Sequence, residues 1–269
     1  MQMRAFLRSE YWAVLFCSAL TLAAGCAADP DRLSAGQVFD ITYHNLWNEM
    51  PDRIILDANE TFMRKDNIIA LLLAGGAGIA MHNTDADNDI ADSFDRRVFN
   101  DFTEESLDHI GNPGTHFAAA GLWYMWSLGG QDEFNQDRAW TMLSALSVNG
   151  LVTLGLKAIV NNKTPNGKSW AWPSGHTSSS FTVAAVLDEF YGPKVGIPAY
   201  IVATLVGLRM MDTGDHWASD VVFGATLGWV VGHTIAGKHK ELEIAGFKVV
   251  PYTASMEGPV MGINLVKRF

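Results

Sequence analysis

The chain of 269 residues carries 19 lysines and arginines against 29 aspartates and glutamates, which gives a formal net charge of −10 with histidine neutral. A composition of 48% apolar and 18% charged residues excludes a disordered chain. The acidic balance argues against non-specific binding of nucleic acid, because no basic excess is present to displace counterions. The two cysteines, Cys17 and Cys26, both lie near the N-terminus, so the body of the chain holds neither a disulfide framework nor a thiolate metal site.

The N-terminal residues have the pattern of a secretory signal. Two arginines precede an apolar stretch from 13 to 22 that is too short for a comfortable membrane span. Small residues then lead directly to Cys26, as in a bacterial lipobox, although Ala23 stands where a lipobox usually has leucine. The pattern predicts a signal peptide over 1–25 and lipidation at Cys26. An ordinary signal peptide cleaved nearby is the alternative, and on either interpretation the protein leaves the cytosol.

Residues 26–65 are mixed and polar, and we expect a linker followed by a short amphipathic packing segment. The main domain is expected over 66–238, where Gly, Pro, Asn and Asp clusters separate apolar stretches of helical length. These stretches cover residues 67–82, 114–128, 133–160, 174–191, 195–211 and 216–236. The sequence therefore predicts an all-α fold, a bundle of about six helices.

Length and hydropathy favour a globular bundle tethered by lipid over a bundle that spans the bilayer. Most of the apolar stretches have about 14–17 residues, fewer than the roughly 20 that cross hydrocarbon. The mean hydropathy of +0.08 is also low for a chain that lies mostly in a membrane. After Gly237 the pattern changes to loose alternation around a turn, which predicts a small C-terminal β-hairpin over 239–269.

The segment Pro173-Ser174-Gly175-His176 is the first candidate for chemistry. A turn directly before an apolar helix leaves backbone N–H groups unpaired at the positive end of the helix dipole, which suits an anion. Gly175 allows a ligand to approach the backbone, the Ser174 hydroxyl adds a donor, and His176 can deliver a proton to the bound anion. The alternative is that Ser174 is only a helix N-cap and His176 only a polar residue of the first turn.

The second candidate is a set of charged residues around two other helices. His216 and Asp220 are four residues apart, so on a helix they share one face. A carboxylate that holds one imidazole nitrogen fixes the tautomer and frees the other nitrogen to attack. Arg209 and Lys157 lie near helix C-termini, where basic side chains either hold phosphate oxygens or simply offset the helix dipole. Each feature alone is weak evidence for a catalytic site. The assignment depends on the order and spacing of all of them.

Taken together, these segments resemble the type 2 phosphatidic acid phosphatase superfamily, which includes bacterial acid phosphatases, lipid phosphatases and vanadium-dependent haloperoxidases. The family pattern is Lys, six residues, Arg-Pro; then Pro-Ser-Gly-His; then Arg, five residues, His, three residues, Asp. The resemblance covers about residues 150–236 and includes the whole second block and the final His-x-x-x-Asp. The sequence departs from the pattern at Thr164, which replaces the first arginine, and in the six residues between Arg209 and His216.

The resemblance implies a metal-independent and cofactor-free phosphatase acting on phosphate monoesters or on lipid and isoprenyl (pyro)phosphates. It implies that His216 is the nucleophile and forms a phosphohistidine, with Asp220 as its orienting partner and His176 as the general acid. The phosphate-binding residues that it implies are Lys157, Ser174, Gly175, Arg209 and, more weakly, Thr164. Lys163 and Lys168 are close enough in sequence to replace the charge that Thr164 lacks.

The expected partners are a phosphate ester, with a membrane lipid phosphate as one candidate, and the membrane itself through the lipid anchor. No nucleic acid is expected, and the oligomeric state stays open. We expect the periplasmic side of a bacterial cell envelope, and Ala27 after Cys26 favours the outer membrane. Two alternatives stay open: a vanadate-dependent haloperoxidase, and a non-catalytic envelope lipoprotein that retains the anion pocket.

The acidic run 85–89 lacks the glycine and glutamate of a calcium loop, so we expect a solvated acidic loop there.

Overall fold

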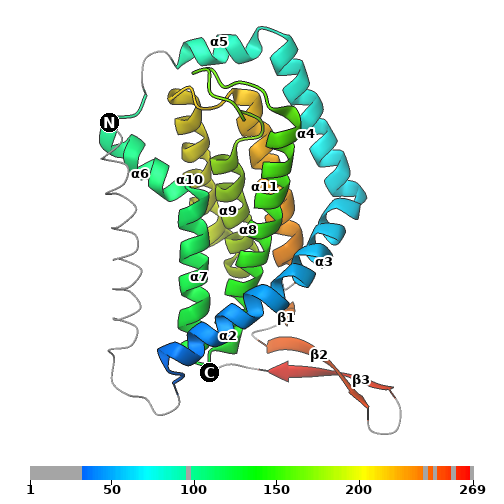
Figure 1. Ribbon diagram of the computed structural model, residues 1–269. Helices are drawn as coiled ribbons and strands as arrows, with labels where there is room; N and C mark the ends of the chain where they lie inside the picture. The colour runs from blue at the N-terminus through cyan, green and yellow to red at the C-terminus, as the bar shows by residue number, and fades with distance from the viewer. Residues whose placement is uncertain (1–31, 95–97, 239–241, 245–246, 256–258, 267–269) are drawn as a thin grey trace.

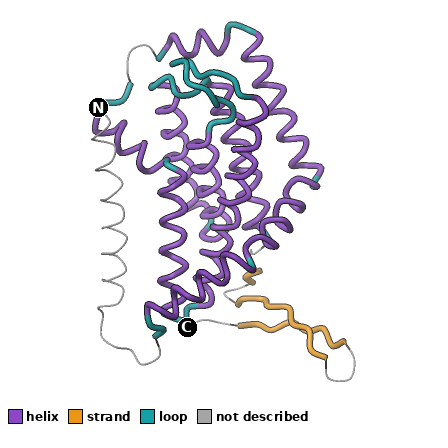
Figure 2. The backbone as a smooth tube through the Cα atoms, in the orientation of Figure 1, coloured by secondary structure: helices purple, strands orange, loops and turns teal. Residues whose placement is uncertain are grey.

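The computed structural model describes residues 32–94 and 98–238, together with the backbone of three strands after them. The predicted signal peptide and the predicted lipidation site at Cys26 lie outside the described residues. Within the described part, the chain forms a helical bundle with a small sheet attached near one end (Figures 1 and 2). The prediction of an all-α fold is confirmed.

Six helices form the bundle at the positions that the sequence predicts. They are α4 (Lys65–Asn83), α7 (Pro113–Gly129), α8 (Glu133–Val160), α9 (Gly175–Tyr191), α10 (Pro193–Asp212) and α11 (Ala218–Gly237). The helices α8 to α11 run alongside one another in the centre, and α7 and α4 flank them on opposite sides (Figure 1). Buried side chains of α8, α9 and α11, such as Leu146, Val186 and Leu227, make up much of the hydrophobic core.

Local signals set the ends of these helices. Asn112, Asp132 and Ser174 each accept a hydrogen bond from a first-turn N–H group and so cap α7, α8 and α9. At its C-terminal end, α8 stops where Asn161 takes the left-handed conformation, with φ of 43°. Gly192, with φ of 72°, then turns the chain from α9 into α10. Because these helices end sharply, the chain reverses direction at the two ends of the bundle.

Four further helices are present that the sequence pattern does not reveal: α2 (Ala35–Asn48), α3 (Met50–Met63), α5 (Ala86–Ser93) and α6 (Asp101–Gly111). Two of them, α2 and α3, occupy the described part of 26–65, where we expected a linker and one packing segment. A capping box between Ser34 and Gln37 begins α2. The apolar pattern is weak because α2 buries just one residue in the described structure, Val38.

An apolar stripe and a buried carboxylate together attach α3 to the bundle. Met50 lies in the hydrophobic core, and Ile54, Ala58 and Phe62 pack against that core. Asp57 is 3% exposed and accepts hydrogen bonds from Ser144 of α8 at 2.6 Å and from Lys238 at 3.0 Å. Arg53, one turn earlier on α3, donates to the same carboxylate at 3.0 Å. Burial alone would raise the pKa of Asp57, but these three partners hold its pKa below the ordinary value. Polar contacts of this kind leave no periodic hydrophobic signal in the sequence.

The predicted C-terminal hairpin is present and has one strand more than expected. The strands β2 (Phe247–Ser255) and β3 (Pro259–Val266) pair antiparallel, with Thr253 opposite Met261. The short strand β1 (Leu242–Ile244) pairs with the other edge of β2, so the strand order is β1-β2-β3. The sheet lies at the end of the bundle away from α5 (Figure 2).

The apolar surface of the bundle indicates association with a membrane. Two helices, α8 and α10, are long and apolar enough to cross one, and α4 with α5, bent by 78°, is a further candidate. Many large apolar side chains are exposed, among them Leu72, Leu73, Ile79, Leu154 and Ile201. The sequence favoured a globular bundle tethered by lipid over a bundle that spans the bilayer. Asn149 is a polar residue within the apolar run of α8. In the structure Asn149 is 1% exposed and donates to Ser178, so it does not face the surroundings.

Small residues allow α9 and α11 to approach closely. Three glycines of α11 face backbone carbonyl oxygens of α9: Gly224, Gly228 and Gly232, against Ser174, Ser178 and Thr182. A Cβ atom at Gly224 would lie 2.7 Å from the first of these oxygens, and a Cβ atom at Gly228 would overlap the second. Because the two helices begin at the candidate site, this close contact fixes the spacing of the residues that they carry.

We expect Gly228→Ala to force α9 and α11 apart and to lower the free energy of unfolding by about 1–3 kcal/mol. The matched control is Gly155→Ala on α8, where an added Cβ meets no atom within 4 Å. That control should be neutral or slightly stabilising, because alanine favours a helix over glycine. Thermal unfolding of the two detergent-solubilised variants measures the difference. Equal melting temperatures would contradict the close packing described here.

Candidate active site

The three sequence blocks converge at one end of the bundle. The C-terminal ends of α8 and α10 and the N-terminal ends of α9 and α11 meet there, under the loop of residues 161–174 (Figure 1). The backbone N–H of Ser174 donates to the carbonyl of Asp220 at 3.1 Å and so joins the start of α9 to α11. The indole N–H of Trp217 donates to the carbonyl of Lys163 at 2.8 Å and joins the loop to α11.

His216 and Asp220 form the contact that their spacing predicts. The Nδ1 atom of His216 lies 3.2 Å from Oδ2 of Asp220, and the backbone N–H of Trp217 donates to the same oxygen at 3.0 Å. His216 is 8% exposed and Asp220 is fully buried. The pair does not lie within a helix as expected, since α11 begins at Ala218 and His216 precedes it. Instead, the carboxylate folds back over the helix start and holds both the imidazole and a first-turn N–H group.

His176 is the second residue of α9 and lies near His216. Its side chain is 29% exposed, and its Nε2 atom is 4.0 Å from Oδ1 of Asp108 on α6. Burial lowers the pKa of His176 to about 4, and electrostatic interactions with His216 and Arg209 also lower it. The negative charges of Asp108 and Asp215 act in the opposite direction. The two imidazoles are thus close enough to interact electrostatically, although they come from different helices.

Arg209 lies in the last turn of α10 and is surrounded by carboxylates. Its Nη1 atom is 3.0 Å from Asp108 and 3.7 Å from Asp215, and its Nη2 atom is 3.9 Å from Glu104. The Nε donor is buried and has no hydrogen-bond partner among the described residues. Despite these carboxylates, no group of three His, Cys, Asp or Glu side chains in the described part is arranged to hold a metal ion.

Lys157 and Ser174 support the loop and the start of α9. The Nζ atom of Lys157 donates to the carbonyls of Trp170 and Ala171, at 2.5 and 3.0 Å. The Ser174 hydroxyl accepts from the N–H of Thr177 at 3.4 Å and contacts that residue's hydroxyl at 2.9 Å. Ser174 is therefore the N-cap of α9, as the alternative interpretation of its motif had it. A Cβ at the neighbouring Gly175 would lie 3.9 Å from Cε of Lys157, so the lysine stem passes close to this helix start.

Thr164 does not supply a free donor at the site. Its hydroxyl donates to Asn166 Oδ1 at 2.6 Å and accepts from the N–H of Lys168 at 2.9 Å, both within its own loop. The ammonium group of Lys168 pairs with Asp215 at 2.6 Å. Burial alone would raise the pKa of Asp215, but hydrogen bonds from Lys168, Asn166 and Thr213 keep it low. Lys168 thus faces Asp215, and its replacement of the charge that a first-block arginine would bring stays a prediction.

The remaining departure from the family pattern lies in the turn before His216. The helix α10 ends at Asp212, and Gly214 takes a positive φ of 67° in the turn that follows. The N–H of His216 donates back to the carbonyl of Met210 at 3.0 Å. This turn accommodates the six residues between Arg209 and His216.

Asp87 is a residue of the site region that the sequence did not reveal. We expected the run 85–89 to be a solvated acidic loop, but most of it belongs to helix α5 and Asp87 is 2% exposed. Its carboxylate accepts from the N–H of Ser219 at 3.0 Å and from the hydroxyl of Ser219 at 2.6 Å. Asp87 therefore holds the first turn of α11, next to Asp220. The sequence carries no sign of this contact, because the partners are 132 residues apart.

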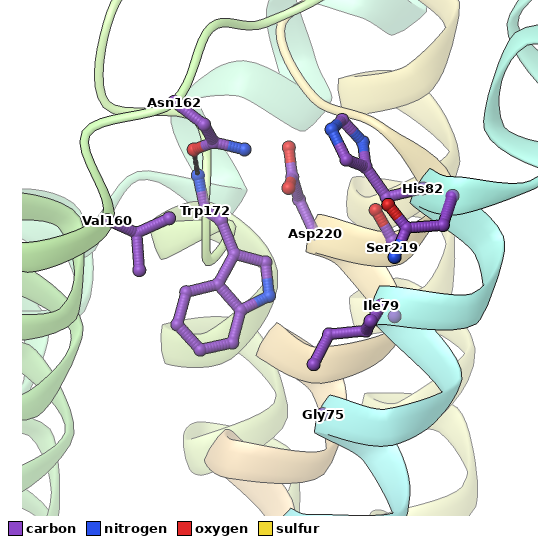
Figure 3. Close-up of a pocket in the computed structure, with 10 residues that line it drawn as sticks. Gly75, Ile79, His82, Val160, Asn162, Trp172, Ser219 and Asp220 are labelled. Carbon is purple, nitrogen blue, oxygen red and sulfur yellow. Dashed lines mark hydrogen bonds between the residues drawn. The ribbon is translucent and has the colours of Figure 1, made fainter.

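A cavity of about 320 Å³ lies beside Asp220, between α4 and the end of α8. It is lined by Gly75, Gly78, Ile79, His82, Asn83, Val160, Asn162, Trp172, Ser219 and Asp220. Figure 3 shows the Asp220 carboxylate between Asn162 and His82, with the indole of Trp172 below. The Oδ1 atom of Asp220 is buried and has no hydrogen-bond partner among the described residues. The lining does not include His176, His216 or Arg209, so this cavity adjoins the far side of the carboxylate.

Comparison with known proteins agrees with this geometry. Residues 138–242 match the model of the PAP2 superfamily, so the chain contains a PAP2 superfamily domain. This domain includes α9, α10 and α11 and all three sequence blocks. It does not include α2 to α7, which contribute Asp87 and Asp108 to the surroundings of the site.

Individual relatives are similar over parts of their length. A lipid A 1-phosphatase of Porphyromonas gingivalis is 33% identical over 86 residues, which is 31% of this chain and 19% of that protein. The chain thus spans about a fifth of the length of this curated relative. A transmembrane PAP2-type phosphatidylglycerolphosphate phosphatase from Bacillus subtilis matches in structure with a TM-score of 0.51 and 19% identity, over 67% of this chain and 96% of that one. Aquifex aeolicus LpxE gives a TM-score of 0.42 and 20% identity, over 50% and 86%.

Proposed function

We propose that the protein is a phosphoric ester hydrolase that acts on lipid phosphates through a phosphohistidine. The observation that carries the proposal is the convergence of His176, Arg209 and the His216–Asp220 pair at one end of the bundle. An imidazole oriented by a buried carboxylate can act as a nucleophile. A guanidinium with an unpaired buried donor suits phosphoryl oxygens.

In the first step of this mechanism, the Nε2 atom of His216 attacks phosphorus in line with the departing oxygen. The N–P bond forms as the P–O bond to the alcohol breaks, and protonated His176 gives its proton to that oxygen. The contact of Nδ1 with Asp220 keeps the lone pair on Nε2 and stabilises the positive charge that develops on the ring. Arg209 and the first N–H groups of α9 balance the charge of the phosphoryl oxygens.

In the second step, water attacks the phosphohistidine and the N–P bond breaks. His176, now neutral, takes a proton from the water, so both histidines return to their starting states as phosphate leaves. Lys157 is assigned to the phosphoryl oxygens from the family pattern, together with its place beside Gly175. Thr164 remains the weakest assignment, because its hydroxyl is bonded within its own loop.

A lipid phosphate is the substrate class that fits the whole molecule best. The exposed apolar side chains and the two long apolar helices favour contact with a membrane. The relative from Porphyromonas gingivalis is, by name, a phosphatase of a lipid. The periplasmic side of the bacterial envelope, the lipid anchor at Cys26 and the outer membrane also belong to this proposal. They rest on the sequence pattern of the N-terminus, which is outside the described residues.

Phosphate release from a substrate panel tests the proposed function. The detergent-solubilised protein is incubated with phosphatidic acid, isoprenyl pyrophosphate or a nucleoside monophosphate in the presence of a metal chelator. We expect chelator-resistant release of phosphate, fastest from the two lipid substrates. Preference for the nucleotide would overturn the assignment of a lipid substrate and leave the assignment as a hydrolase intact.

The two alternative functions give different results in the same experiment. Phosphate or vanadate binding without any turnover would show a non-catalytic protein that retains the anion pocket. Bromide oxidation that requires vanadate and peroxide would show a haloperoxidase. Neither alternative accounts for chelator-resistant hydrolysis of a lipid phosphate.

A further inference from the structure

Asp108 lies beside two residues of the candidate site, although it comes from a helix outside the matched domain. Its Oδ1 atom is 3.0 Å from Nη1 of Arg209 and 4.0 Å from Nε2 of His176. The same oxygen therefore stands between the guanidinium and the imidazole. The carboxylate is 40% exposed, so it reaches the site from its solvent side. Neither the family match nor the motif spacing assigns this residue a role.

The fold holds Asp108 in this place through both ends of α6. Before the helix, the carboxylate of Asp212 at the end of α10 accepts from the N–H groups of Val98 and Phe99, at 2.7 and 3.2 Å. At the end of the helix, Gly111 lies so close to Val206 of α10 that a Cβ would not fit. These two contacts tie α6 to the helix that carries Arg209. The position of Asp108 is thus set by packing rather than by a loose surface contact.

The charges around His176 show how the carboxylate of Asp108 affects the protonation of this imidazole. Burial disfavours the protonated imidazole, and the neighbouring Arg209 and His216 are basic groups that disfavour it further. Two carboxylates act in the other direction, Asp108 from α6 and Asp215 from the turn after α10. Of these, Asp108 has the larger effect on the pKa of His176. A general acid must carry a proton before it can donate one.

We propose that Asp108 is a positioning residue that favours the protonated form of His176 and holds its imidazole toward the leaving oxygen. This inference rests on the proposed function and adds a second imidazole–carboxylate pair to it. In this arrangement, Asp220 supports His216, which is the nucleophile, and Asp108 supports His176, which is the general acid. Asp108 itself does not touch the reacting atoms in the proposed mechanism, since it acts through His176 and Arg209.

The dependence on the leaving group distinguishes this role from a structural one. An alkyl alkoxide is a poor leaving group and needs a proton as the P–O bond breaks, whereas a dinitrophenolate leaves without one. Loss of support for His176 should therefore slow hydrolysis of an alkyl phosphate and spare hydrolysis of 2,4-dinitrophenyl phosphate. A substitution that merely distorted the site would slow both substrates equally.

The variant to use is Asp108→Asn, which removes the charge and keeps an acceptor for Arg209. We expect kcat for hexyl phosphate to fall about 10- to 100-fold and kcat for 2,4-dinitrophenyl phosphate to change less than about threefold. His176→Ala should show the same selectivity with a larger loss. The alkaline fall in the activity of Asp108→Asn with hexyl phosphate should begin at lower pH than in the parent, because His176 loses its proton more readily. Glu105→Gln, on the same helix and 3.8 Å from His109, is the control and should leave both rates unchanged.

The outcomes separate this inference from the proposed function on which it rests. Equal losses on the two substrates, or no loss on either, would overturn the role of Asp108 and leave the hydrolase intact. If the parent protein hydrolyses neither substrate nor any lipid phosphate, the proposed function itself fails and this inference fails with it. Retained hydrolysis of dinitrophenyl phosphate by Asp108→Asn also shows that the variant is folded.

Discussion

His216→Ala is expected to lower the rate of phosphate release by about 10⁴- to 10⁶-fold, because it removes the atom that bonds to phosphorus. The residual rate would come from the anion-binding groups, which remain in place. The variant should fold, since the backbone N–H of residue 216 still donates to Met210 and Asp220 keeps its bond from the N–H of Trp217. His44→Ala, an exposed histidine of α2 at the other end of the bundle, is the matched control and should retain full activity.

Trapping the intermediate gives a more direct measurement than the rate. With a ³²P-labelled substrate and a rapid quench in alkali, the parent should retain label that acid removes, as expected of phosphohistidine. Label should accumulate in His176→Ala when a good leaving group is used, because the second step then lacks its base. His216→Ala should retain none. Label that stays on His216→Ala, or a rate close to that of the parent, would assign the nucleophile to another residue.

The sequence predicted the bundle well because its helices bury apolar faces against one another. Five of the six long helices follow an apolar run that ends at a glycine or an asparagine, and α10 ends at Asp212, two residues before Gly214. These signals are local. The helices α2, α3, α5 and α6 are harder to predict because each buries few apolar side chains. Polar contacts help to attach them, such as Asp57 with Lys238 and Asp87 with Ser219, and these contacts have no period in the sequence.

The candidate site was predictable in the parts that the family pattern names and unpredictable elsewhere. The spacing of His216 and Asp220 indicated their contact correctly, although the reason given, a shared helix face, was wrong. The capping geometry at the start of α11 brings the two side chains together instead, because the Asp220 carboxylate accepts a hydrogen bond from the N–H of Trp217. Asp108 could not be found from one sequence, since its partner Arg209 is 101 residues away and α6 has no motif.

Asp220→Asn is expected to lower the rate of phosphate release by about 10²- to 10⁴-fold with little change in the fold. The N–H of Trp217 requires an acceptor at the Oδ2 position, so the amide oxygen of the variant should take that place. The amide nitrogen would then occupy the position of Oδ1, which has no hydrogen-bond partner in the described structure and therefore tolerates the change. The contact with His216 would persist, and the negative charge opposite the imidazole would be lost.

This design separates orientation from charge. If the carboxylate serves only to orient His216, the amide oxygen should replace it and the rate should stay within about tenfold of the parent. If its charge stabilises the developing phosphohistidine, the rate should fall by the full amount while the affinity for vanadate changes little. Asp87→Asn is the control, because Asp87 holds Ser219 in the same helix turn. The imidazole near Asp87 is that of His82, whose Nδ1 lies 3.6 Å from Oδ2 of Asp87, and His82 has no role in the proposed reaction. A loss of activity in Asp87→Asn as large as in Asp220→Asn would mean that displacement of α11, rather than the charge of Asp220, limits the reaction.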